Sequence, residues 1–157
     1  MKMRSDTKTL IKCIAIPLIV GGLAAFLTRD GMTYYIDEVT KPALTPPPWV
    51  FSVVWTILYV MMGYASFLVL EEGTGDQKTA RILYFAQLFF NFFWSIIFFN
   101  LRWYLFAFAW LLFLWFLVLA TLKAFAEIQP KAGKILVPYL LWLTFAAYLN
   151  FGVYLLN

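Results

Sequence analysis

The 157-residue chain is 64% hydrophobic and only 13% charged, whereas a soluble domain is about half apolar and about a quarter charged. A soluble core could not bury so many apolar side chains, so the composition excludes an ordinary soluble domain and predicts that a lipid bilayer is the solvent. The net charge of +4 does not indicate a nucleic-acid partner, because the basic residues gather in the N-terminal tail and between the apolar segments.

Five segments are long and apolar enough to cross a membrane as helices, which takes about 20 residues each. The chain is therefore predicted to be all-α, an integral membrane five-transmembrane-helix bundle that forms a single membrane domain over residues 1–157. One helix across 82–122 would be about 60 Å long, twice the hydrocarbon core, so a turn is predicted at Asn100-Leu101-Arg102. The predicted helices cover about 10–28, 49–70, 82–101, 103–122 and 134–156.

The first segment contains Lys12 near its start, where a lysine can reach the membrane interface, so the segment is kept as a span. A signal peptide is the alternative interpretation of a basic start followed by an apolar run. The apolar part is long for a signal peptide, and the polar residues Thr28-Arg29-Asp30 follow it in place of a small-residue cleavage site.

The distribution of lysine and arginine predicts the orientation of the bundle. Cytoplasmic loops carry an excess of these residues, which places the N-terminus in the cytoplasm and the C-terminus outside. Only Arg29, Lys41 and Arg102 lie on the predicted outer side, together with a long external loop over 29–48. Nine basic residues lie on the other side: Lys2, Arg4, Lys8, Lys12, Lys78, Arg81, Lys123, Lys131 and Lys134.

The predicted external loop ends in Pro46-Pro47-Pro48, directly before the second helix. Proline fixes φ and is well tolerated in the first turn of a helix, so these residues form a stiff helix start. A loop of about 20 residues is also long for a small bundle, and such loops often act as lids or binding elements. Tyr34 and Tyr35 are placed to fold over the mouth of the bundle.

Polar and aromatic side chains recur on one face of three predicted helices. Residues three or four apart share a helix face. The faces are Phe51, Trp55, Tyr59 and Met62 on the second helix, Gln87, Asn91 and Ser95 with Trp94 and Phe98 beside them on the third, and Pro138, Trp142, Phe145, Ala146, Leu149 and Asn150 on the fifth.

The helical rise of 1.5 Å gives the depth of each side chain. Trp55, Trp94 and Asn150 lie roughly 9 to 10 Å below the outer ends of their helices, and Tyr59, Asn91 and Ala146 lie near 15 Å. These matched depths predict an aromatic-lined pocket beneath the loop, suited to a flat and largely apolar ligand. Plain helix packing is the alternative, because 21% of the chain is aromatic.

Little in the sequence supports conventional catalysis. The chain has no histidine, the usual general base and metal ligand, and no acid or base is evident within the spans. Cys13 is the single cysteine, so no intrachain disulfide forms, and it is interpreted as an apolar filler of a helix. No metal site and no required cofactor are predicted.

The sequence resembles the translocator protein family, also called the tryptophan-rich sensory proteins (TspO), in three blocks. The first holds Lys41-Pro42, Pro46-Pro47, Trp49, Phe51, Trp55, Leu58-Tyr59 and Gly63; the second Gln87-Leu88, Asn91, Trp94 and Phe98-Phe99; the third Pro138-Tyr139, Trp142, Phe145-Ala146, Tyr148-Leu149-Asn150 and Leu156-Asn157. The five-span layout extends the resemblance over essentially the whole chain.

The resemblance implies a bacterial membrane protein, often dimeric, that binds porphyrins and in some members cholesterol and benzodiazepine-type drugs. It implies that Trp55 and Trp142 match tryptophans implicated in light-dependent breakdown of protoporphyrin IX. The implied ligand-binding residues are Tyr35, Pro46, Phe51, Trp55, Tyr59, Asn91, Trp94, Phe98, Trp142, Ala146, Leu149 and Asn150.

The chain departs from the family pattern at three places. Tyr35 stands where a tryptophan is common, and Ser52-Val53 stands where Gly-Pro is frequent. No basic residue follows Tyr148 or Tyr154, as the proposed sterol-binding motif requires, so sterol binding through that motif is not expected.

The leading functional prediction is a membrane receptor or sensor that binds protoporphyrin IX-type porphyrins and drug-like aromatic ligands, with Lys41 placed to attract propionates. The second is an enzyme that degrades the porphyrin with light and oxygen, with Trp55 and Trp142 as electron donors or radical sites. The alternative is a transporter of porphyrin or sterol-like molecules, which the odd number of spans and the lack of charge in all but the first do not favour.

Overall fold

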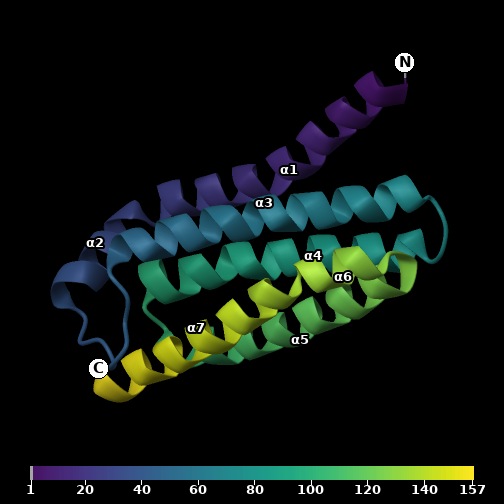
Figure 1. Cartoon of the computed structure of the whole chain (residues 1–157). Coiled ribbons are helices and arrows are strands. Elements are labelled where there is room, and N and C mark those ends of the chain that lie inside the picture. The colour runs from purple at the N-terminus through teal and green to yellow at the C-terminus, as the bar shows by residue number, and fades with distance from the viewer. Residues whose placement is uncertain (1) are drawn as a thin grey trace.

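The computed structural model describes residues 2–157, with side-chain environments from residue 6 onward. Helices are the only regular elements in these residues, and five stretches are long and apolar enough to cross a membrane: Asp6–Leu27, Pro48–Glu72, Gln77–Leu101, Tyr104–Ile128 and Pro130–Leu156. The predicted all-α five-span membrane fold is therefore confirmed. The elements are α1 (Lys2–Leu27), α2 (Arg29–Glu38), α3 (Pro48–Glu72), α4 (Gln77–Ser95), a π-helical turn η1 (Ile96–Leu101), α5 (Tyr104–Ile128), α6 (Pro130–Ile135) and α7 (Val137–Leu156) (Figure 1).

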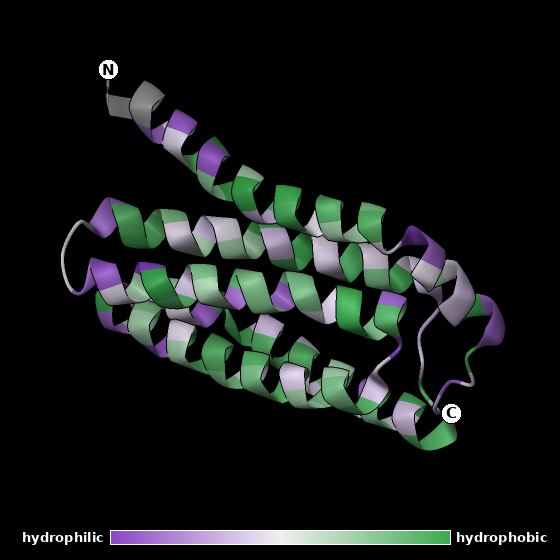
Figure 2. Ribbon diagram, turned by 180° about the vertical axis from the view of Figure 1, so that it is seen from behind, coloured by the Kyte–Doolittle hydropathy of each residue, from purple (hydrophilic) through white to green (hydrophobic). Residues whose placement is uncertain are grey.

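The bundle has two distinct ends. The end that carries α2 also carries the C-terminus and the turn between η1 and α5, and we call it the α2 end (Figure 1). The opposite end, which we call the α6 end, carries α6, the turn between α3 and α4, and the N-terminal part of α1. Hydrophilic residues concentrate toward both ends and apolar residues cover the middle of the helices, as expected for a membrane-spanning bundle (Figure 2).

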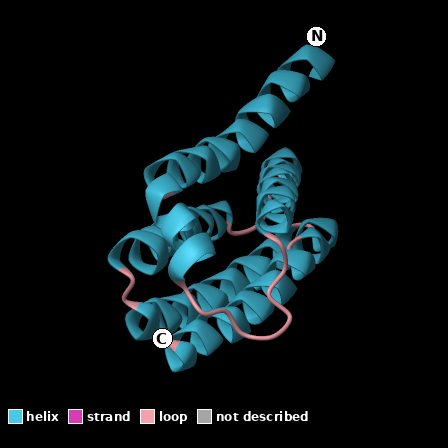
Figure 3. Ribbon diagram, turned by 90° about the vertical axis from the view of Figure 1, so that its left-hand side faces the viewer, coloured by secondary structure: helices cyan, strands magenta, loops and turns pink. Residues whose placement is uncertain are grey.

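Two glycines bring α1 and α3 into close contact. A Cβ atom on Gly63 would collide with the backbone of Cys13 and Ile14, and one on Gly21 would collide with the ring of Tyr59. Small residues at these positions let the helix backbones approach closely, which is the main source of packing energy between helices in lipid. Toward its N-terminus α1 diverges from the other helices (Figures 1 and 3). Pro17 lies inside α1, where it removes the backbone donor for the Cys13 carbonyl and favours a bend.

In place of the expected loop over 29–48, the structure has the helix α2 over Arg29–Glu38, so the loop is corrected to 39–47. Only Thr28 separates α2 from α1, and its hydroxyl donates a hydrogen bond of 2.7 Å to the Ala24 carbonyl. Tyr35 is buried on the inner face of α2, with its ring 5.8 Å from that of Phe98. A ten-residue helix is marginal in isolation, so this contact with the bundle stabilises it.

The fifth span is interrupted near its start. The helix ends at Ile135 and resumes at Val137, and Pro138 occupies the first turn of α7 rather than the interior of a long helix. The helix therefore breaks at Leu136, two residues before Pro138. Proline is well tolerated in a first helical turn, since its missing N–H has no intrahelical partner there.

Candidate ligand-binding cavity

A cavity of about 290 Å³ lies at the α2 end, enclosed by α1, α2, α3, the α4–η1 segment and α7. All the predicted ligand-binding residues except Pro46 and Asn91 line it: Tyr35, Phe51, Trp55, Tyr59, Trp94, Phe98, Trp142, Ala146, Leu149 and Asn150. The three helix faces that were predicted to lie at matching depths therefore meet at one cavity. Ligand binding by these residues stays a prediction.

Aromatic rings form the walls of the cavity in two groups. Trp55 stacks on Tyr59 with ring centroids 5.6 Å apart and an interplanar angle of 29°, and Trp94 stacks on Phe98 at 5.3 Å and 24°. Phe51 meets Trp142 edge to face at 6.0 Å, which connects α3 to α7 across the cavity. Such walls present flat π faces and few charges, which suits a planar apolar ligand.

Asn91 lies behind the cavity wall, in a chain of hydrogen bonds that we call the tyrosine–amide chain (Tyr59, Asn91, Tyr139 and Gln87). The Tyr59 hydroxyl donates to Asn91 Oδ1 at 2.8 Å, and Asn91 Nδ2 donates to the Tyr139 oxygen at 2.7 Å. The Tyr139 hydroxyl then donates to Gln87 Oε1 at 2.8 Å. Tyr59 therefore lies between Asn91 and the cavity. The hydrogen bond to Asn91 fixes the Tyr59 ring, which stacks on Trp55. Tyr139 was not predicted as a site residue, although it lies one helical turn before Trp142.

A second hydrogen bond ties the far side of the cavity together. Trp94 Nε1 donates to Asn150 Oδ1 at 3.1 Å, and Asn150 Nδ2 donates to the Tyr104 carbonyl at 2.8 Å. These bonds join α4, α7 and α5 at one depth. The predicted common depth of Trp94 and Asn150 is realised as a direct contact.

Trp142 differs from these satisfied groups. Its indole N–H is buried and has no hydrogen-bond partner among the described residues. Trp142 also lines the cavity, so this unpaired donor belongs to a residue of the cavity wall.

Comparison with known proteins shows the family to which the chain belongs. The TspO/MBR family model matches residues 13–156. The chain belongs to the TspO/MBR family. It is similar to the tryptophan-rich protein TspO of Chlorobaculum tepidum, with 38% identity over 99% of both chains. It is also similar to the TspO protein of Archaeoglobus fulgidus, with 35% identity over 94% of this chain and 96% of the relative, and to the human translocator protein, with 38% identity over 82% and 78%.

In this TspO/MBR-family chain, α1 contributes a cavity wall that the sequence did not predict. The wall is formed by small side chains, Gly21, Gly22, Ala24 and Ala25, with Leu18 and Thr28 beside them. Gly21 allows the close approach of the Tyr59 ring, whereas a Cβ atom on Gly22 would meet nothing within 4 Å, so this residue leaves space at the cavity.

The roof of the cavity in this family member is α2, which contributes Met32 and Tyr35, and the segment 39–47 follows α2 in the chain. Burial raises the pKa of Tyr35 to about 12, so its phenol stays protonated and can donate. Lys41 Nζ donates to the carbonyl of Ile36 in the last turn of α2 at 2.9 Å and to that of Val39, the C-cap residue, at 3.0 Å. A second cavity of about 480 Å³ lies under the segment, lined by Tyr35, Lys41 and Pro46 among others.

The roof is anchored to the bundle on both sides. The Asn157 side chain pairs with the backbone of Thr40, accepting from its N–H at 3.1 Å and donating to its carbonyl at 2.8 Å, and the Tyr148 hydroxyl donates to the Ala43 carbonyl at 2.9 Å. These contacts fix the segment 39–47 on α7.

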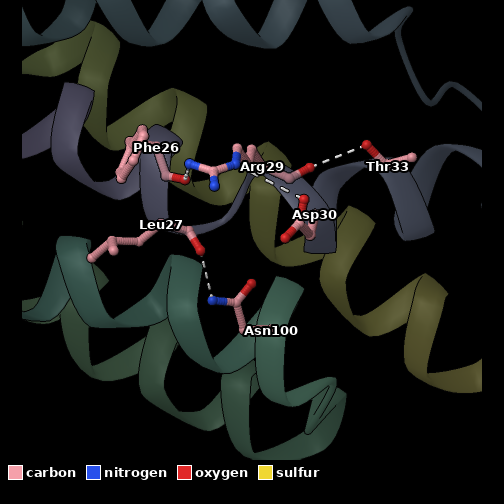
Figure 4. A network of polar contacts seen from close by, with 6 residues as sticks. All are labelled: Phe26, Leu27, Arg29, Asp30, Thr33 and Asn100. Atoms are coloured by element: carbon pink, nitrogen blue, oxygen red, sulfur yellow. Dashed lines mark hydrogen bonds and ion pairs between the residues drawn. The ribbon is translucent and has the colours of Figure 1, made fainter.

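On the other side of the roof, Asn100 Nδ2 donates to the Leu27 carbonyl at 3.0 Å where α1 meets α2 (Figure 4). Arg29 stays local, with its guanidinium 3.9 Å from Asp30 and 3.5 Å from the Phe26 carbonyl. A Cβ on Gly31 would collide with Phe99 and Asn100, so α2 lies tightly on η1. Anchors on both sides hold α2 over the cavity.

Proposed function

We propose that the chain binds porphyrins of the protoporphyrin IX type, and related flat aromatic molecules, in the cavity beneath α2. The observation that carries the proposal is the convergence of aromatic faces from α3, α4–η1 and α7 on one cavity, with an unpartnered indole N–H at Trp142. Membership of the TspO/MBR family supports the same class of ligand. The protein acts in this proposal as a membrane receptor or sensor.

The size of the site constrains how a macrocycle binds. Small-molecule sites typically enclose about 300 to 1,000 Å³, and the cavity lies at the lower end of this range. The ring would enter the aromatic cavity, while its carboxylates extend toward the second cavity, on the far side of Tyr35. An ammonium group has three donors, and Lys41 uses two of them on α2. The third is available for a propionate.

The binding proposal is tested by quenching of tryptophan fluorescence with protoporphyrin IX in purified protein. Ala146 is buried in the cavity wall, so Ala146→Phe fills the cavity and is expected to lower the affinity by at least about tenfold. The control is Leu141→Phe on the lipid-facing side of the same helix, where the side chain is 64% exposed. Equal affinity in both variants would contradict the proposed location.

A second candidate function is light-dependent degradation of the bound porphyrin. It is favoured by the position of Trp55 and Trp142, which both line the cavity from different helices. In this proposal light excites the porphyrin, dioxygen oxidises the macrocycle, and the two indoles act as electron donors or radical sites beside it. No acid–base step is required.

The degradation proposal is tested by illuminating the complex in air and following its absorption spectrum. A defined product should form with the wild type and disappear with Trp55→Phe or Trp142→Phe at porphyrin concentrations that saturate binding. Loss of porphyrin at the rate seen in free detergent would reject degradation and leave the binding proposal intact.

We also propose that the α2 end faces the outside and that the protein forms a homodimer in the bilayer. The orientation is supported by the three basic residues at the α2 end, Arg29, Lys41 and Arg102, against nine in the remainder of the chain. Cys13 is buried, so single cysteines introduced by Thr45→Cys and Thr74→Cys can be labelled selectively. An impermeant maleimide applied to intact cells should label the first and spare the second; the reverse pattern would invert the orientation. Cross-linking in membranes tests the dimer.

A further inference from the structure

A smaller cavity of about 80 Å³ lies near the α6 end, separate from the site beneath α2. Four helices contribute to it: Cys13 from α1, Ser66 from α3, Tyr84 from α4 and Phe125 from α5. None of its lining residues lines the large cavity. The porphyrin proposal therefore does not account for it.

The small cavity contains a buried hydroxyl group that lacks a partner. The Tyr84 side chain is only 4% exposed, and its hydroxyl makes no hydrogen bond within the described part of the chain. Its ring stacks on Phe125 at 5.7 Å, and Cys13 and Ser66 line the same cavity. The Ser66 hydroxyl donates to the Gly63 carbonyl at 2.9 Å. A buried donor without an acceptor is unfavourable, so an acceptor from outside the chain is expected here.

One wall of the small cavity faces lipid. Its lining includes Ile16, Leu70 and Phe85, whose side chains are 39%, 42% and 46% exposed. N-terminal to the close contact at Gly63, α1 diverges from the bundle (Figures 1 and 3). The cavity therefore lies where α1 diverges from its neighbours, and we call this lipid-facing cavity the wedge.

A free cation lies on the rim of the wedge. Arg81 lines the cavity one helical turn before Tyr84, and its guanidinium makes no ion pair or hydrogen bond among the described residues. Three residues on a helix are separated by about 4.5 Å along the axis. A guanidinium suits a phosphate oxygen pair, whereas a phenol suits a carbonyl oxygen. In a glycerophospholipid the ester carbonyls lie a few ångströms deeper than the phosphate, in the same order as Arg81 and Tyr84.

We propose that this wedge is a binding site for one glycerophospholipid. The Arg81 guanidinium binds the phosphate, the Tyr84 hydroxyl donates to an ester carbonyl, and an acyl chain lies against Ile16, Leu70 and Phe85. The lipid supplies the acceptor that Tyr84 lacks and fills the space left by the divergence of α1.

The test is native mass spectrometry of the full-length protein in detergent, titrated with diester phosphatidylglycerol. The wild type should retain one lipid more tightly than any further ones. Arg81→Gln should weaken that first lipid about tenfold, as expected for loss of a charge-assisted hydrogen bond. Lys123→Gln removes the same charge from an exposed position at the same end and should leave the affinity unchanged. Equal affinity of the two variants would overturn the proposal.

The role of Tyr84 is tested with a diether analogue of the same lipid, which lacks the ester carbonyls. The wild type should bind the diester about fivefold more tightly than the diether, and Tyr84→Phe should abolish this preference while keeping the ring contact with Phe125. A wild type without the preference would overturn the proposal without recourse to any variant. Quenching by protoporphyrin IX, measured in parallel, verifies that each variant is folded.

Discussion

The interior of the bundle contains two kinds of buried polar group, those with hydrogen-bond partners and those without. The tyrosine–amide chain is satisfied from end to end and connects α3, α4 and α7. The Trp142 indole N–H and the Tyr84 hydroxyl are equally buried but have no partner in the described chain, and both residues line cavities. Satisfied polar groups hold helices together, whereas the unpartnered donors mark where an external molecule can complete the structure.

The largest loss of stability is expected from removing the hydrogen bonds of Asn91. Asn91→Leu removes two hydrogen bonds and leaves the Tyr59 hydroxyl without its acceptor. The free energy of unfolding should fall by about 2 to 3 kcal/mol, measured by thermal unfolding in detergent.

The double variant Asn91→Leu, Tyr59→Phe should lose less unfolding free energy than the two single variants lose in sum, because the Tyr59 hydroxyl that lacks an acceptor is then absent. Strict additivity would show that the two side chains do not act as a unit.

A smaller effect is expected from Trp94→Phe. This change removes one hydrogen bond to Asn150 and keeps most of the aromatic packing on Phe98. Interhelical hydrogen bonds in membranes contribute about 0.6 to 1.7 kcal/mol, so a loss of about 1 kcal/mol is expected in the same unfolding assay. Trp103→Phe, at a position where the side chain is 58% exposed, serves as the control and should leave stability unchanged.

Loss of the unpartnered Trp142 N–H should affect ligand affinity more than stability. Trp142→Phe removes an N–H that bonds to nothing in the described chain, so stability should change by less than about 0.5 kcal/mol. The affinity for protoporphyrin IX should fall about fivefold, since the free donor is lost to the ligand. A large loss of stability with unchanged affinity would assign the Trp142 N–H to the fold rather than to the ligand.

The smallest effect is expected from an exposed polar contact at the start of α4. Hydrogen bonds from Thr79 hold the pKa of Asp76 below its ordinary value, including one from the Thr79 N–H at 3.0 Å. The stabilisation is present above the ordinary carboxyl pKa and is lost as the pH falls through the lower pKa of the folded state. Unfolding midpoints of the wild type and of Asp76→Ala should converge in acid. A difference that persists at the lowest pH would refute this cause.

Two predicted residues, Pro46 and Asn91, do not line the large cavity, and the wall from α1 was not predicted. Asn91 is the more instructive case. The depth of Asn91 follows from the helical rise alone. Asn91 does lie level with Tyr59, since it accepts a hydrogen bond from the Tyr59 hydroxyl. Its exclusion from the cavity depends on rotation of α4 and on the Tyr59 ring, which covers it. Small changes in helix rotation move a side chain from a cavity wall to the layer behind it, and periodicity does not resolve them.

Other differences arise where a segment has no strong pattern of its own. Segment 29–38 is polar and short, and it is helical because Tyr35 packs on Phe98 and Phe99 and because Lys41 bonds to the carbonyls of Ile36 and Val39 at its C-terminal end. Two predicted spans also end before the observed helices, since α3 continues to Glu72 and α5 to Ile128. Helices extend past the apolar stretch because their polar ends are still hydrogen-bonded at the membrane interface.

The sequence by itself determined that the protein spans a bilayer five times, and it determined the depth of each side chain, because apolar length and helical rise are local properties. Only the tertiary structure decided which side chains face each other across a cavity, which are covered by a neighbour, and that α2 covers the large cavity. These features depend on helix rotation, close glycine contacts and hydrogen bonds between segments far apart in the chain, and no local pattern contains that information.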